Sequence, residues 1–139
     1  MTRLILAVLG GLILAFGLVF VTDALFHSLS PSTSTMPDGS DREAMRAYVA
    51  SQPASALAVI LAGWAIAAFV GAAIAARFAG RGESPGWIVT ALFLLATAAN
   101  FAMVPHPTWM VLSAIVAIVA AGWLGARVGG AGRRGEVPA

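Results

Sequence analysis

The chain of 139 residues contains no cysteine, which excludes a disulfide framework, a thiolate metal site and a cysteine nucleophile. Lysine is also absent, so all eight basic residues are arginine. Charged residues make up only 10% of the chain and hydrophobic residues 60%, against about 25% and 45–50% in soluble globular proteins. Because so few polar side chains could not cover a core in water, the composition predicts an integral membrane protein.

Motifs of the common enzyme classes are missing as well. The sequence has no Gly-rich phosphate loop, no nucleophile-elbow serine and no c-type haem attachment site. No stretch assembles a general acid, a base and a nucleophile, so we expect a protein that is not an enzyme. A net charge of +2 does not indicate nucleic-acid binding, because the arginines sit at the ends of apolar runs and form no single basic patch.

Four long apolar runs dominate the chain, at residues 4–26, 54–76, 86–104 and 108–126. A helix rises ~1.5 Å per residue, so about 20 residues cross a hydrocarbon core of ~30 Å. The runs therefore predict an all-α fold, a polytopic membrane four-helix bundle made of two helical hairpins. The lipid bilayer is the first expected partner.

The segments between and after the runs are polar. Residues 27–53 form the one long loop, and residues 41–50 within it read as a short surface helix, capped by Asp41 or Ser40. Met45, Tyr48 and Val49 give this helix an apolar stripe at helical spacing. Residues 128–139, rich in Gly and Arg, are expected to be a disordered cytoplasmic tail.

Arginine is distributed unequally between the two sides of the predicted bundle. One side carries Arg3, Arg77, Arg81, Arg127, Arg133 and Arg134, and the other carries Arg42 and Arg46. The positive-inside rule then places both termini in the cytoplasm. The long loop and the turn Pro105-His106-Pro107 face outward in this topology.

Four polar residues lie where the first and third runs end. Asp23 and His27 are four residues apart and share a helix face, while Asn100 and His106 close the third run and the turn after it. Since both runs travel outward, we expect the four side chains at similar depth at an outer mouth. Two imidazoles and a carboxylate suit a divalent metal such as zinc, which Asp23, His27 and His106 would bind. The same groups would also suit proton relay.

A plainer interpretation of these residues stays open. Asp23 and His27 could pair with each other near the end of the run, where burial of a charge costs less than at the bilayer centre. His106, between two prolines, could be an exposed turn residue. Under this interpretation the chain needs no cofactor, and the polar group contributes only helix contacts.

Small residues recur every four positions in three of the runs, where they would let helices approach closely. The residues expected at helix contacts are Gly11, Gly63, Gly71, Ala117, Ala121 and Gly125. Such ladders predict a tight bundle, or one that also docks against other transmembrane helices.

The chain resembles a group of small bacterial four-span inner-membrane proteins. The resemblance rests on Asp23 and His27 at the end of the first run, on Ala47-Tyr48 ahead of Pro53, and on the turn Val104-Pro105-His106-Pro107-x-Trp109 before the last run. It covers about residues 17–127. It implies four spans and a bacterial inner membrane, and it brings no activity with it.

Two functions follow as hypotheses. The first is a non-enzymatic accessory or structural subunit that packs against itself, as a homo-oligomer, or against a larger inner-membrane complex. The second is a small transporter or a metal- or proton-handling protein with a polar site at the outer mouth. A third, contact with a pigment or quinone through Trp64 or Trp123, ranks below both.

Overall fold

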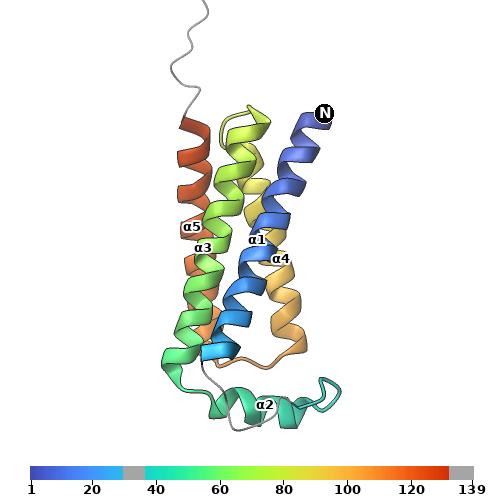
Figure 1. Ribbon diagram of the computed structural model, residues 1–139, viewed down its shortest axis with the longest axis vertical. Helices are drawn as coiled ribbons and strands as arrows, with labels where there is room; N and C mark the ends of the chain where they lie inside the picture. The colour runs from blue at the N-terminus through green and yellow to red at the C-terminus, as the bar shows by residue number, and fades with distance from the viewer. Residues whose placement is uncertain (30–36, 132–139) are drawn as a thin grey trace, which may run out of the picture.

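The computed structural model describes residues 1–29 and 37–131, and the side chains of residues 26–29 lie outside the description. The described residues form five helices and no strand: α1 (Thr2–Leu29), α2 (Arg42–Ser51), α3 (Ala54–Ala79), α4 (Ser84–Met103) and α5 (Thr108–Gly130). The four long helices run up and down in an antiparallel bundle, and α2 lies across one end (Figure 1). The predicted all-α four-helix bundle is therefore confirmed.

The four long helices are long and apolar enough to cross a membrane, which makes the chain a multi-pass membrane protein. Their outward faces carry large apolar side chains. Ile13, Phe20 and Leu95 are 72%, 75% and 69% exposed. In a bilayer these side chains contact acyl chains, so exposure that would be unfavourable in water costs nothing there.

Helices α1 and α5 extend beyond their predicted ends. Helix α1 continues to Leu29, and α5 continues to Gly130, so residues 128–130 are helical and not part of the tail. The cause in α5 is packing, because a Cβ atom at Gly129 would meet the carbonyl oxygen of Ala73 in α3. This close contact carries the helix past the predicted boundary. Residues 132–139 of the predicted tail and 30–36 of the predicted loop lie outside the described residues.

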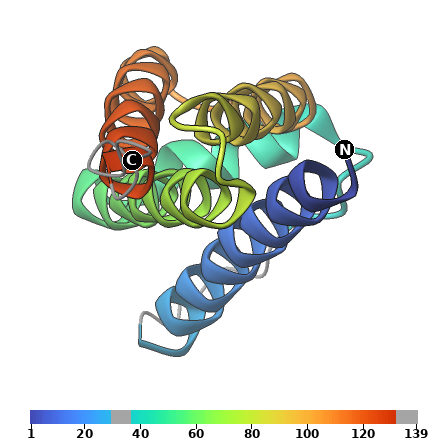
Figure 2. The same ribbon diagram turned by 90° about the horizontal axis from the view of Figure 1, so that it is seen from above.

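Helix α3 is the centre of the bundle, with α1 on one side and α5 on the other (Figure 2). A Cβ atom on Gly11 of α1 would lie only 2.5 Å from the carbonyl oxygen of Gly71, and one on Gly71 would lie 2.8 Å from that of Gly11. On the other side, a Cβ atom on Gly125 of α5 would meet the carbonyl oxygen of Phe69. The three backbones are therefore in direct contact, with no side chains between them.

The remaining predicted contact residues divide into two groups. Gly63 faces the side chain of Thr22 in α1, whereas Ala117 and Ala121 of α5 are only half-buried. The fully buried line in α5 is instead Ala114, Ile118, Gly122 and Ala126. Ala117 and Ala121 each precede a residue of this line by one position, which places them about 100° around the helix from it.

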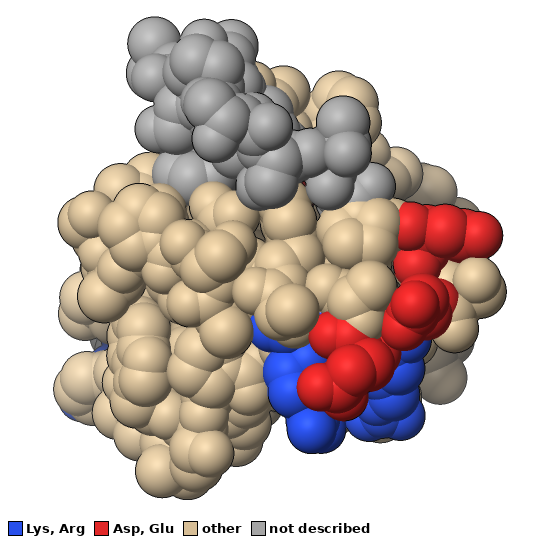
Figure 3. Space-filling view, turned by 90° about the horizontal axis from the view of Figure 1, so that it is seen from below, with Lys and Arg blue, Asp and Glu red and all other residues tan. Residues whose placement is uncertain are grey.

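The two ends of the bundle differ in charge. At the end that α2 covers, hereafter the α2 end, acidic and basic side chains gather in one cluster (Figure 3). The charged residues of α2 and the turn before it are Asp38, Asp41, Arg42, Glu43 and Arg46. At the opposite end, hereafter the terminal end, the described charged residues are Arg3, Arg77, Arg81, Glu83 and Arg127. Gly80 ends α3 there in the left-handed conformation, with φ of 68°.

The backbone contact between α3 and α5 gives a matched pair of glycine variants. Gly125→Ala places a methyl group against the carbonyl oxygen of Phe69, whereas Gly17→Ala adds one where nothing lies within 4 Å. We expect Gly125→Ala to lower the free energy of unfolding by about 1–3 kcal/mol, as overpacking does, and Gly17→Ala to change it by less than about 0.5 kcal/mol. Thermal unfolding in detergent measures both, and equal effects would contradict the contact.

Candidate functional site

A pocket of about 190 Å³ lies at the α2 end, where α1 and α4 diverge in both views (Figures 1 and 2). Every helix and the turn between α4 and α5 contribute to it. The residues that line it are Asp23, Tyr48, Val49, Gln52, Leu57, Ile60, Trp64, Asn100, Val104, His106 and Met110. The pocket therefore lies between the α2 end of the bundle and helix α2, which covers it.

Helix α2 supplies the cover because its sequence is amphipathic. Asp41 starts the helix by accepting hydrogen bonds from the backbone N–H groups of Glu43 and Ala44, at 3.1 and 3.0 Å. The expected stripe then turns toward the bundle, with Val49 buried and Tyr48 half-buried. One turn further on, Gln52 ends the helix, and its Nε2 donates to the carbonyl oxygen of Tyr48 at 3.5 Å. This face places Tyr48, Val49 and Gln52 against the pocket.

His106 is held firmly by the turn that carries it. Its Nδ1 lies 2.7 Å from the carbonyl oxygen of Val104, and because a carbonyl only accepts, Nδ1 carries the proton in this hydrogen bond. In the neutral ring Nε2 is then a hydrogen-bond acceptor. The imidazole packs edge-on against Phe101 at 5.0 Å between ring centroids and lies 6.1 Å from Trp64. His106 is thus half-buried, and its interpretation as an exposed turn residue is wrong.

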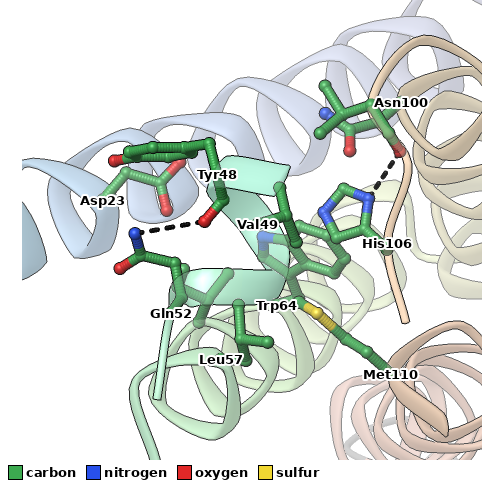
Figure 4. Close-up of a pocket in the computed structure, with 11 residues that line it drawn as sticks. Asp23, Tyr48, Val49, Gln52, Leu57, Trp64, Asn100, His106 and Met110 are labelled. Carbon is green, nitrogen blue, oxygen red and sulfur yellow. Dashed lines mark hydrogen bonds between the residues drawn. The ribbon is translucent and has the colours of Figure 1, made fainter. Parts of the chain in front are cut away.

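Three of the four predicted site residues line this one pocket. Asp23 reaches it from α1, Asn100 from α4, and His106 from the turn. Figure 4 shows Asp23 on one side with Tyr48 and Gln52, and Asn100 with His106 on the other. His27 belongs to the last turns of α1, but its side chain lies outside the described residues. Topology therefore brings together the groups that the sequence singled out, at opposite sides of a shared space.

A metal site within this pocket is left as a prediction. Among the side chains that the structure describes, no group of three His, Cys, Asp or Glu residues could hold a metal ion. The described pocket lining contributes one carboxylate, from Asp23, and one imidazole, from His106. The proposed set of Asp23, His27 and His106 depends on a side chain outside this part of the chain.

Sequence reasoning missed two members of the lining, Tyr48 and Gln52, and considered a third, Trp64, only for contact with a pigment or quinone. Tyr48 lies on the apolar stripe of the surface helix, which indicated a buried face but not a pocket. Trp64 is only 8% exposed, and its spacing with the small residues of α3 fits a core position equally well. Gln52 ends α2 and carries no motif. These residues come together in one site only because α2 lies across the α2 end of the bundle.

Trp123, the other tryptophan considered for a pigment or quinone, faces a different environment. Its ring is 43% exposed, and the guanidinium carbon of Arg127 lies 5.1 Å from the ring centroid. This cation–π contact stands near the terminal end. Trp123 therefore lies apart from the pocket that Trp64 lines.

Comparison with protein-family models, with curated protein sequences and with solved structures gives no match for this chain. The resemblance to small bacterial inner-membrane proteins stays a prediction that rests on the motifs alone.

The ring contacts of His106 can be separated from its hydrogen bond by two variants. His106→Phe keeps an aromatic ring beside Phe101 and Trp64 and loses the hydrogen bond to Val104, whereas His106→Ala loses both. We expect His106→Ala to be the less stable by about 0.5–1.5 kcal/mol, the contribution of an aromatic pair. Thermal unfolding of the purified variants measures the difference, and equal stabilities would show that the ring contacts contribute nothing.

Proposed function

We propose that the chain is a non-enzymatic membrane protein that binds a small ligand in the pocket at its α2 end. The observation that carries this proposal is the convergence of Asp23, Asn100 and His106 on one pocket. These residues come from three separate parts of the chain, and each places a polar group in a protein with very few of them. Polar groups within membrane spans are costly, which makes them candidates for function.

Binding accounts for this arrangement better than transport. Toward the terminal end, α3 touches α1 and α5 through backbone atoms at Gly71, Phe69 and Ala73. A solute that passed between these helices would have to separate them, which would break these contacts. The pocket is therefore proposed as a recognition site that lies at one side of the membrane.

The accessory-subunit hypothesis gains no support from the small-residue ladders. These ladders predicted either a tight bundle or docking to other helices, and Gly11, Gly71 and Gly125 contact helices of the same chain. Their packing explains the ladders without a second protein. Docking to other transmembrane helices remains a prediction without a surface assigned to it.

We further propose that the protein lies in a bacterial inner membrane with both termini in the cytoplasm. The support is the arginine distribution, with Arg3, Arg77, Arg81 and Arg127 at the terminal end and Arg42 and Arg46 at the α2 end. With this orientation the pocket lies at the outer side of the cell membrane. A ligand would reach it without crossing the bilayer.

The absence of cysteine allows a direct test of this orientation. Ser51 and Ser84 are residues at opposite ends, and each hydroxyl donates to a carbonyl oxygen three residues earlier in an exposed hydrogen bond. We expect a membrane-impermeant maleimide to label Ser51→Cys in intact spheroplasts and to label Ser84→Cys only after lysis. The reverse pattern would invert the proposed topology.

Ligand binding itself is tested by thermal unfolding of the detergent-solubilised full-length protein against small cations, anions and neutral polar molecules. A ligand at about 100 times its Kd stabilises the folded protein by about 2.7 kcal/mol. We expect at least one class to raise Tm, and Asn100→Ala to reduce that shift. Thr108→Ala, an exposed residue near the same end but outside the pocket lining, is the control. If no class raises Tm, the proposed function is wrong.

A further inference from the structure

We infer that the ligand of this pocket is a small organic cation, an ammonium group attached to a short apolar part. The inference rests on the proposed function and deepens it by naming the ligand class. Three features of the pocket favour such a cation: its polar atoms, its aromatic rings and its apolar lining residues.

The one charged group among the described lining residues is the carboxylate of Asp23, which is half-buried and accepts hydrogen bonds. The amide of Gln52 donates one N–H to the carbonyl oxygen of Tyr48, and its Oε1 is a further acceptor. His106 donates through Nδ1, and its neutral ring offers Nε2 as an acceptor. A lining of this kind matches a ligand that carries donors and positive charge.

Asp23 already interacts with its surroundings, and a ligand does not require it to be free. An ionised carboxylate has about four lone-pair sites, so it can accept from the protein and from a ligand together. Its half-buried position strengthens the attraction to a cation, because the effective dielectric there is lower than in water.

Two aromatic side chains line the same space. Figure 4 shows the ring of Tyr48 beside the carboxylate of Asp23, with Trp64 deeper between the two sides of the pocket. Ring faces carry negative potential and attract ammonium groups within about 6 Å. The carboxylate and the Tyr48 ring together therefore mark the place of the charged group.

The rest of the lining selects against other ligands. Val49, Leu57, Ile60 and Met110 make much of the wall apolar, whereas calcium and magnesium require about six or more oxygen ligands. No arginine belongs to the described lining, since Arg42 and Arg46 are exposed on α2, so an anion would find no counter-charge. The volume of about 190 Å³ accommodates a short chain.

Such a group has two sources at a membrane surface, a free amine or the amine headgroup of a phospholipid. The two share the ammonium that Asp23 and Tyr48 would bind. Nanodiscs of different lipid composition distinguish them.

The test compares three probes of equal chain length, n-butylammonium, butyrate and n-butanol, by thermal unfolding of the full-length protein in nanodiscs of phosphatidylglycerol. We expect n-butylammonium to raise Tm and the other two to have no effect. Asp23→Asn should weaken the apparent affinity by about tenfold or more, as loss of a charged hydrogen-bond partner does. Glu43→Gln removes an exposed carboxylate of α2 outside the pocket lining, and it should leave the affinity unchanged.

A second pair of variants keeps the test decisive if Asp23→Asn does not fold. Tyr48→Phe retains the ring and is the reference for this pair. Tyr48→Leu removes the ring and should weaken binding by about fivefold. Equal affinity of the two Tyr48 variants would overturn the inference.

The outcomes also separate this inference from the proposed function. If butyrate or n-butanol raises Tm as much as n-butylammonium does, and Asn100→Ala removes the shift, the pocket binds a ligand but the cation is wrong. If n-butylammonium fails in phosphatidylglycerol nanodiscs, the cation is wrong as well. Nanodiscs of phosphatidylethanolamine distinguish the two sources of the ammonium group. If the initial Tm is higher there and n-butylammonium raises it no further, the ligand is the lipid headgroup. If n-butylammonium raises Tm by as much as in phosphatidylglycerol, the ligand is a free amine.

Discussion

Direct backbone contact between α3 and its two neighbours is the constraint on which the rest of this structure depends. In a bilayer the lipid tails are as apolar as the helices, so association relies on close packing and not on the hydrophobic effect. Gly11, Gly71 and Gly125 allow this packing in one half of the bundle. In the other half the facing residues are large, among them Trp64, Phe101 and Met110. The divergence of α1 and α4 toward this second half leaves room for the pocket (Figures 1 and 2).

Most of the fold was predictable from sequence because lipid imposes a strong pattern. An apolar run of about 20 residues has few alternatives to a membrane-spanning helix, and four such runs match the four long helices. Helix ends were less predictable. Gly129 and Gly130 read as tail residues, since glycine is a poor helix former in isolation. Their packing against α3 and the turn after it keeps them helical, and contacts between distant residues are not visible in a local pattern.

The candidate site was predictable in part for a similar reason. Topology alone places the ends of α1 and α4 at one side of the membrane, so the order of the apolar runs was enough to group Asp23, Asn100 and His106. The direction of each side chain depends on helix rotation, which a low-complexity apolar sequence leaves undetermined. The same ambiguity affected α5, where Ala114 and Ile118 are buried while the predicted contact residues beside them are half-buried. The contribution of α2 depended on where a surface helix settles, and no residue of its sequence indicated that.

Helix α2 packs Val49 into the core of the bundle, but several of its polar interactions lie within the helix itself. Its cap at Asp41, its ion pair between Glu43 and Arg46 at 3.8 Å, and the hydrogen bond from Gln52 to Tyr48 are all local. The spanning helices, in contrast, depend on Gly11, Gly71 and Gly125, where an added Cβ atom would meet backbone of the neighbouring helix. Substitutions of Tyr48 or Gln52 can therefore alter the pocket without disturbing these helix contacts. Part of the pocket lining is thus independent of the residues that assemble the bundle.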